Sequence, residues 1–492
     1  MNIDRPRIFI LILLGTTLSS LFFYPLFSVL HDNIIILQWR LVNTIELYCV
    51  YLLFSLLASI AFFLTYKCRN IYLKLLIILV TVFVPFMSFF IYFLEQVVSK
   101  GMIIEVGIFI NEYRLILSPI IAILVAGILF LFIRYPQRIV KIVLLTLFII
   151  SPINLLSIWV GINEYPNDTL ILIDNNKNIK QNSGYHKPNN NILVILFDEL
   201  SYDYLYERGE IKPQYENFRY LSTVSNNYHR ALSPGDATLT AISGLIMGKR
   251  FENIQMKYDK IYKITKKQNK EILTIDKNNI FAYAKAAGYK TFVFGPYLSY
   301  CELFSQWLDG CRSFSVYNYG SLQKEFRFLH PILTTIVIWP RQFPYGLLKN
   351  PVFSSWQKNI TEQTYELTMK AINGHEPFFI FVHFYLPHLP FVFNKNGYYR
   401  NKEPFLQNHE NYSRQLDYVD GLLGNLIAEL KNKGKFNNSA IVVLADHNYR
   451  IMFPDKKRVI PLIIKKRNQN VGKNIYEPVN AEEILRKELF GF

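Results

Sequence analysis

The hydrophobic positions divide the chain into two parts. Up to about residue 162, long apolar segments follow one another with short polar breaks, and five of them are long enough to cross a bilayer, which takes about 20 residues. From about residue 190, shorter apolar runs alternate with amphipathic segments, as in a globular domain. We therefore expect a transmembrane anchor of five helices over residues 1–162, a polar linker over 163–190 and a globular domain over 191–492.

The five expected spans contain no acid or base near their centres, which argues against an ion or proton pathway through the bundle. They cover about Ile8 to Leu30, Ile45 to Tyr66, Leu73 to Leu94, Leu115 to Ile133 and Ile139 to Ile162. The first is long and lacks a clear cleavage site, so we interpret it as a retained helix and not as a signal peptide.

Basic residues lie mainly on one side of these spans. Arg5 and Arg7 precede the first span, and further clusters fall between the second and third spans and between the fourth and fifth. Because positive loops stay in the cytosol, the N-terminus is expected inside. Five crossings then place the globular domain outside the inner (cytoplasmic) membrane, in the periplasm or beyond the cell surface.

The second half predicts an α/β domain with a central, mostly parallel sheet, because apolar runs alternate with helical patterns. The expected strands are Asn191 to Leu200, Thr291 to Gly295, Phe378 to His383, Ser439 to Ala445 and Val459 to Lys465. The expected helices are Ala237 to Gly248, Lys277 to Gly288 and Tyr412 to Gly434. The aromatic segment 312–360 has no predicted form.

Polar side chains stand where two of these strands end. Asp198 and Glu199 end the first strand, and Asp446 and His447 follow the strand that ends at Ala445. In open α/β sheets, ligands collect at the carboxyl ends of strands. The alternative is that the acids simply mark the strand ends.

Three further side chains are candidates for the same edge of the sheet. Thr238 falls in the first turn of a helix, where unpaired N–H groups favour a phosphate or sulfate, although it could equally be a capping residue. His383 ends an apolar strand and is, with His388, a candidate to bind the substrate. His388 lies between two prolines in a stiff extended loop, which suits contact with a substrate, although a lone histidine is often structural.

Composition and charge change this picture little. The hydrophobic total of 51% and the aromatic content of 16% are high for a soluble protein. The formal net charge of +16 agrees with a membrane location, because basic residues orient spans and attract anionic head groups. We find no nucleic-acid-binding motif and expect no nucleic-acid partner.

The four cysteines bear on the compartment. Cys49 and Cys68 lie in or beside apolar segments and are expected to be free. Cys301 and Cys311 lie in the globular half. If that half is outside the cytosol we expect a local disulfide between them, and the alternative is two buried thiols.

Two carboxylates, an imidazole and a hydroxyl make a suitable shell for one divalent cation. The metal would be held by Asp198, Thr238, Asp446 and His447, and it would lower the pKa of the Thr238 hydroxyl to make a nucleophile. We expect Zn or Mn rather than Mg or Ca.

From about residue 190 to 466 the chain resembles the alkaline phosphatase superfamily, in its sulfatase-like branch. The resemblance rests on NILVILFDEL, ATLTAISGLIMGK, AAGYKTFVFG, FFIFVHFYLPHLPF and YVDGLLGNLIAELKNKGKFNNSAIVVLADHN, in the family's order. Within that superfamily, the chain, with its five expected N-terminal spans, resembles the membrane-anchored lipoteichoic acid synthases and phosphoethanolamine or phosphoglycerol transferases. The resemblance implies the four metal ligands above, with His388 on the substrate phosphate.

The chain departs from the sulfatase pattern in three ways. The Cys or Ser that sulfatases oxidise to formylglycine is replaced by Thr238, and the Pro and Arg that follow it are missing. Lys457 and Arg458 stand where many relatives have a histidine, which argues against a second metal unless His383 is recruited. Glu199 is either an additional ligand, as in relatives with paired acids, or points away.

The resemblance therefore implies a membrane-bound transferase that moves a phosphoalcohol head group from a phospholipid donor to a glycan or lipid-linked sugar of the envelope or capsule, through a phospho-threonine. One alternative is a phosphodiesterase or sulfatase-like hydrolase that uses water as the acceptor. Another is a catalytically degenerate protein that binds a lipid or a partner in envelope assembly.

Overall fold

The computed structural model describes residues 8–33 and 41–67 and most of the chain from residue 190 onward. That second part comprises residues 190–252, 254–257, 260–264, 270–273, 277–314, 346–374, 377–399, 406–449 and 458–491, with isolated residues between them. The chain forms two compact units. Unit 1 contains residues 1–34, 39–167 and 322–349, and unit 2 contains the remainder.

In unit 1 the structure shows two long helices, α1 (Ile8–Asn33) and α2 (Leu41–Lys67), where the first two spans were predicted. Of the helices that the structure describes, one, at Leu47–Leu64, is long and apolar enough to cross a membrane. Apart from isolated residues, the other three predicted spans and the linker 163–190 lie outside the described residues, and so does Cys68.

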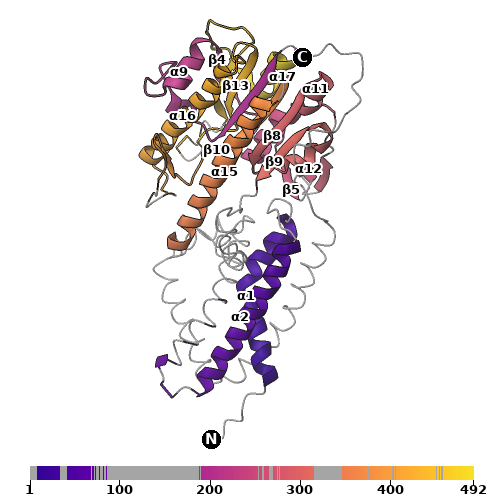
Figure 1. Ribbon diagram of the computed structural model, residues 1–492, viewed down its shortest axis with the longest axis vertical. Helices are drawn as coiled ribbons and strands as arrows, with labels where there is room; N and C mark the ends of the chain where they lie inside the picture. The colour runs from indigo at the N-terminus through magenta and orange to yellow at the C-terminus, as the bar shows by residue number, and fades with distance from the viewer. Residues whose placement is uncertain are drawn as a thin grey trace. The chain divides into compact units, whose positions relative to one another are not determined.

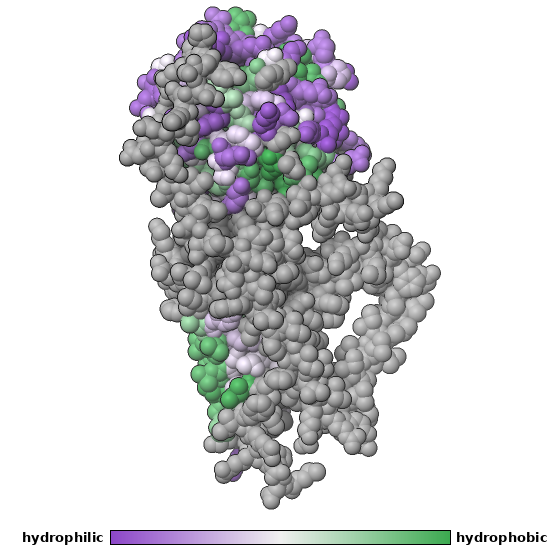
Figure 2. Space-filling model, turned by 90° about the vertical axis from the view of Figure 1, so that its right-hand side faces the viewer, coloured by the Kyte–Doolittle hydropathy of each residue, from purple (hydrophilic) through white to green (hydrophobic). Residues whose placement is uncertain are grey.

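Small residues let α1 and α2 approach closely. A Cβ on Gly15 would lie 2.2 Å from the backbone oxygen of Ser55. The hydroxyl of Ser55 donates to Ser19 Oγ at 2.9 Å, and that of Tyr51 donates to the Thr16 carbonyl at 2.8 Å. Such small residues and interhelical hydrogen bonds are typical of helix pairs in membranes. α2 also exposes several leucines, and the part of unit 1 that is coloured on the face seen in Figure 2 is mostly apolar.

Unit 2 is built on one large sheet. Among the described residues, nine strands form it in the order β15-β4-β14-β13-β1-β10-β8-β9, with β16 also paired to β4 (Figure 1). The strands are β1 (Asn191–Asp198), β4 (Asn226–Leu232), β8 (Lys290–Pro296), β9 (Gly310–Phe314), β10 (Phe378–Pro387), β13 (Ser439–Ala445), β14 (Val459–Lys465), β15 (Lys473–Ile475) and β16 (Val479–Asn480). The pairings from β13 through β1, β10 and β8 to β9 are all parallel, whereas β14 is antiparallel to both of its neighbours.

The sheet is covered on both faces, because every residue of β1 and β13 is buried. Two groups of helices cover it: α9 packs with α16, and α10 and α11 pack with α17. The helices are α8 (Tyr202–Leu205), α9 (Glu216–Thr223), α10 (Thr238–Met247), α11 (Ile280–Ala286), α12 (Tyr300–Phe304), α15 (Gly346–Gly374), α16 (His409–Asn432) and α17 (Ala481–Phe490). Smaller sheets are formed by β2 (Tyr206–Glu207) with β3 (Glu210–Ile211), by β5 (Ile254–Lys257), β6 (Lys260–Ile264) and β7 (Lys270–Leu273), and by β11 (Phe393–Asn394) with β12 (Gly397–Tyr398).

The predicted α/β architecture with a mostly parallel sheet is confirmed for unit 2. β13 and β14 have the predicted bounds, and α10 ends as predicted at Gly248, whose φ of 61° is left-handed. β10 runs four residues beyond its predicted end at His383. β4, whose residues NNYHRAL are largely polar, and the long α15 were not predicted.

A buried lysine is the last residue of β14. Lys465 is fully buried at the end of β14, and its Nζ donates to the carbonyl oxygens of Phe436, Ser439 and Lys466 at 3.0, 3.3 and 3.1 Å. Burial lowers the pKa of Lys465 to about 8, because the ammonium has lost its hydration.

This pKa predicts how stability depends on pH. Below pH 8 the folded and unfolded chains both carry the proton, and the penalty for burying the charge is fully present. Between about 8 and the ordinary value of 10.5, the folded chain has lost a proton that the unfolded chain keeps, so stability rises with pH. Relative to Lys465→Met, the wild type should gain at most about 1.4 kcal/mol per pH unit in this window. Thermal unfolding of both proteins across the window measures it, and parallel curves would contradict it.

Candidate functional site: a buried metal centre

Parallel pairing brings the ends of three strands to one place. β1 pairs with β10 and with β13, and its last residues are in register with Pro387 and Ala445. Asp198, Asp446 and His447 therefore meet at the carboxyl edge of the sheet. Each of the three offers one ligand atom, these atoms lie within 4.8 Å of one another, and all three residues are buried.

The Asp446 carboxylate is held by backbone donors. Its Oδ1 accepts from the N–H of Glu199 at 3.0 Å and from that of His447 at 2.7 Å. Burial by itself raises the pKa of Asp446, but the His447 side chain, these N–H groups and His383 outweigh it, and the pKa lies below its usual value. Asp446 is therefore ionised although it is fully buried.

The tautomer of His447 shows what this group can hold. Its Nδ1 lies 2.9 Å from the carbonyl oxygen of Asn448, which can only accept, so Nδ1 carries a proton. Nε2 lies 3.2 Å from Asp446 Oδ2. These two atoms approach favourably in a buried site with either a proton or a metal ion between them. An oxygen and nitrogen donor set of this kind suits a divalent cation of the Zn or Mn type, so the residues fit the expected metal.

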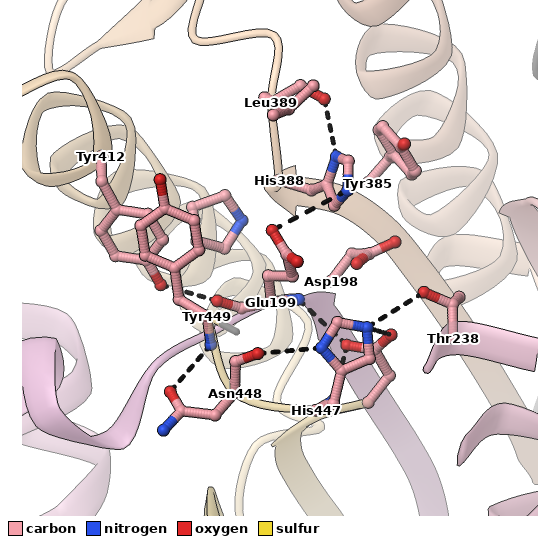
Figure 3. Close-up of polar contacts among 12 residues, drawn as sticks. Asp198, Glu199, Thr238, Tyr385, His388, Leu389, Tyr412, His447, Asn448 and Tyr449 are labelled. Atoms are coloured by element: carbon pink, nitrogen blue, oxygen red, sulfur yellow. Dashed lines mark hydrogen bonds and ion pairs between the residues drawn. The ribbon is translucent and has the colours of Figure 1, made fainter. Parts of the chain in front are cut away.

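Thr238 lies beside the same imidazole. It is the first residue of α10, and its Oγ1 is 3.3 Å from His447 Nε2, so that the two side chains face each other (Figure 3). The N-cap position belongs to Ala237, so the Thr238 hydroxyl is not the cap of the helix. It stands at the positive end of the helix dipole, where negative charge on the hydroxyl oxygen or on a phosphoryl group is favoured.

Glu199 occupies a strained turn directly after β1. Its φ of 60° is in the left-handed region, which a non-glycine residue adopts at a cost of about 1 kcal/mol or more. The turn directs its N–H to Asp446 and its carboxylate toward His388, with Oε2 3.8 Å from Nε2 (Figure 3). Glu199 thus faces His388 and is not among the clustered ligand atoms.

His388 lies at the partly open side of the site. Its backbone N–H donates to the Asp198 carbonyl at 3.2 Å, and its ring Nδ1 donates to the Leu389 carbonyl at 2.7 Å. The ring packs against Tyr385, with centroids 4.5 Å apart. Nε2 is thereby directed toward Glu199, and 15% of the side chain remains exposed. This position suits contact with a substrate.

His383 contacts Asp198, one of the candidate metal ligands. It is fully buried, with Nε2 3.5 Å from Asp198 Oδ2 and Nδ1 3.0 Å from the hydroxyl of Tyr300. Burial lowers the pKa of His383 to about 4, although Asp446 and the Pro296 carbonyl act in the opposite direction. A neutral imidazole in this position contacts Asp198, whereas a role in binding substrate would need an open path to it.

Cys301 and Cys311 are joined in a disulfide, with their Cα atoms 5.6 Å apart. The bridge ties α12 to β9, and Tyr300, the residue before Cys301, contacts His383. Burial, together with the carboxylates of Asp198 and Asp446, raises the pKa of Tyr300 well above its usual value, so its hydroxyl stays protonated. Cys49, the other cysteine that the structure describes, is free and exposed.

The sequence analysis missed three residues that contact the site. Tyr300, beside His383, and Tyr412, whose hydroxyl donates to the Glu199 carbonyl, stand in segments without a motif. Gln415, which donates to the His388 carbonyl, could have been found, because it is a polar residue on the buried face of α16.

The fold and this geometry agree with a comparison to known families. The family model described as Sulfatase matches residues 190–473, more than half of the chain. The chain belongs to the sulfatase family. Membership supports an enzyme of the sulfatase type, and sulfatase-like enzymes depend on metals.

Among the solved structures similar to this chain is a protein in the alkaline phosphatase superfamily from Vibrio parahaemolyticus, 16% identical over 62% of this chain and 67% of its own, with a TM-score of 0.37. The phosphonate monoester hydrolase of Agrobacterium radiobacter is 15% identical over 61% of this chain and 72% of its own, with a TM-score of 0.40. The PsFucS1 sulfatase from Pseudoalteromonas sp. is 15% identical over 61% and 67%, with a TM-score of 0.41. Similarity this low carries no information on the substrate of this sulfatase-family chain. No match is found among curated proteins.

Metal binding at this site is testable by thermal unfolding. Mn²⁺ or Zn²⁺ at 100 times its Kd should stabilise the purified protein by about 2.7 kcal/mol, because the ion binds only the folded state. Asp446→Asn should abolish the shift. The matched control is Asp309→Asn, which changes a carboxylate bound to Lys285 and Thr291 near the start of β8 and should keep the shift. An equal shift in Asp446→Asn would place the ion elsewhere.

Proposed function

We propose that this sulfatase-family protein is a membrane-anchored phosphotransferase with Thr238 as its nucleophile. The observation that carries the proposal is the 3.3 Å separation between Thr238 Oγ1 and His447 Nε2 inside a buried group of metal ligands. A hydroxyl held there at a helix start can attack phosphorus. A divalent cation held by Asp198, Asp446 and His447 would supply the charge that favours the ionised hydroxyl and neutralises the phosphoryl oxygens.

The reaction runs in two displacements. The Thr238 oxygen forms a bond to phosphorus and loses its proton, while the bond from phosphorus to the lipid oxygen breaks and that oxygen takes up a proton. In the second step an acceptor hydroxyl attacks the same phosphorus, and Thr238 is released and protonated again. His388 contacts a phosphate oxygen through Nε2, and the Glu199 carboxylate lies 3.8 Å from the same nitrogen.

Residue 238 argues against sulfate ester hydrolysis. By resemblance, sulfatases use an aldehyde made from Cys or Ser, and Thr238 cannot yield that group because its β-carbon carries a methyl. The chain therefore shares the family's fold and the acids of its metal site while carrying an ordinary hydroxyl nucleophile. Such a nucleophile suits phosphoryl or phosphodiester transfer.

The apolar N-terminal part supports a lipid donor and a location at the inner membrane. α2 is long and apolar enough to cross a bilayer, and a membrane-anchored enzyme meets phospholipid at high local concentration. We therefore propose phospholipid as the donor, and a glycan or lipid-linked sugar outside the membrane as the acceptor. The head group moved is phosphoethanolamine or phosphoglycerol.

Removing the nucleophile gives the first test. Thr238→Ala should lower release of labelled head group from vesicles of phosphatidylethanolamine and phosphatidylglycerol by at least about 10³-fold, because no covalent intermediate can form. The matched control is Thr240→Ala, two residues further along α10, whose hydroxyl donates to the Ala237 carbonyl. Activity in Thr238→Ala equal to that of this control would exclude Thr238 as the nucleophile.

The fate of the label separates the transferase from the hydrolase. A transferase should place the labelled head group on a glycan fraction and leave diacylglycerol, because a sugar hydroxyl ends the reaction. A hydrolase would release the label only as a small alcohol phosphate. Mass spectrometry of the lipid and glycan fractions, with and without the protein, measures the partition, and label found only in water-soluble phosphate would refute transfer.

A further inference from the structure

One face of α16 reaches several of the segments that carry the site. Tyr412 and Gln415 are three residues apart, so they lie on the same face of the helix. Both are fully buried. Neither lies within the group of metal ligands, and neither is needed as a nucleophile or an acid in the reaction proposed above.

Gln415 holds the backbone on both sides of the His388 side chain. Its Nε2 donates to the carbonyl oxygens of Pro387 and His388 at 3.0 and 2.8 Å. Its Oε1 accepts from the N–H groups of Val392 and Phe393 at 2.8 and 3.2 Å. Only an amide supplies two donors and an acceptor in this arrangement. The loop that directs His388 toward Glu199 is therefore fastened at two points by one side chain.

Tyr412 contacts the segment that follows β1 and the segment that follows β13. Its hydroxyl donates to the carbonyl of Glu199 at 2.7 Å and accepts from the N–H of Ser201 at 2.8 Å. Its ring stacks on Tyr449, with centroids 4.6 Å apart and planes 13° from parallel (Figure 3). Tyr412 thus fixes the strained turn after Asp198 and packs against the segment that follows His447.

We propose that Tyr412 and Gln415 are positioning residues with separate tasks, a proposal that rests on the phosphotransferase function. Tyr412 sets the metal-ligand segments, because the Glu199 N–H that it holds in place binds Asp446. Gln415 sets His388 for the substrate. The helix face formed by these two residues fixes the distance between the part of the site that binds the metal and the part that binds the phosphate.

The division of tasks is tested first by metal binding without turnover. Calorimetric titration of the full-length protein in detergent with Mn²⁺ should show an affinity about tenfold weaker in Tyr412→Phe, which is the range for residues that support metal ligands. Gln415→Met should bind Mn²⁺ within about twofold of the wild type. The matched control is Tyr228→Phe, which removes a buried hydroxyl bound to Glu488 and should also bind as the wild type does. Equal affinity in Tyr412→Phe and Tyr228→Phe would overturn the role of Tyr412.

A double-mutant cycle then tests Gln415. In the head-group release assay, Gln415→Met should lower kcat/KM about tenfold, because His388 is displaced from the substrate. In a His388→Ala background the same substitution should have little further effect, because Gln415 acts through His388. A full tenfold loss in both backgrounds would show a merely structural role and overturn the proposal.

Folding and the underlying function are separated within the same set. If Gln415→Met does not fold, Gln415→Glu replaces it, since it keeps an acceptor for Val392 and Phe393 while losing both donors to the His388 loop, and the same cycle is expected. A wild type that binds no Mn²⁺ and releases no head group would refute the proposed function. A wild type that does both, with variants that match it, would refute only the positioning roles.

Discussion

Two buried acids and an imidazole are brought together at the carboxyl edge of the sheet, and unit 2 is arranged so that they can stay there. Asp446 is ionised in a site with no exposure, and His447 Nε2 lies 3.2 Å from one of its oxygens. This contact is favourable only with a proton or a metal ion between the two atoms. The backbone N–H groups on Asp446 Oδ1 lower the free energy of the ionised carboxylate. The adjacent inner strands β13, β1 and β10 hold the three side chains in place.

The rest of the site serves this electrostatic requirement from different directions. α10 brings Thr238 with the positive end of its dipole, and the left-handed turn at Glu199 gives an N–H to Asp446 while sending its own carboxylate toward His388. A strained turn of this kind persists only where surrounding contacts determine it. Here the surrounding contacts come from Tyr412, so α16 holds the conformation of the turn at Glu199.

The sequence was informative where hydrophobic pattern and strand ends coincide. β13 and β14 were predicted to the residue because their apolar runs are uninterrupted and bounded by polar residues. β4 was missed because its strand is polar, and its pairing with β14 is a tertiary property. Asp198, Asp446 and His447 could be named from their position after strands, since parallel neighbours end at one edge.

What could not be predicted depends on contacts between distant segments. The approach of Tyr412 to Glu199, the φ of Glu199 and the seat of His383 behind Asp198 have no local pattern. Gln415 is instructive, because a polar residue on an apolar helix face indicates a buried partner without saying which one.

In unit 1, the hydroxyls between α1 and α2 are also polar groups in apolar surroundings, and they bond across the helix pair. Apolar side chains alone would let two helices slide past each other. A slip of one turn, about 5.4 Å, would break the bond that Ser55 donates to Ser19 and would leave the Tyr51 hydroxyl without its acceptor on Thr16, in apolar surroundings. The hydroxyls therefore act as a latch that fixes the axial register of the first two helices.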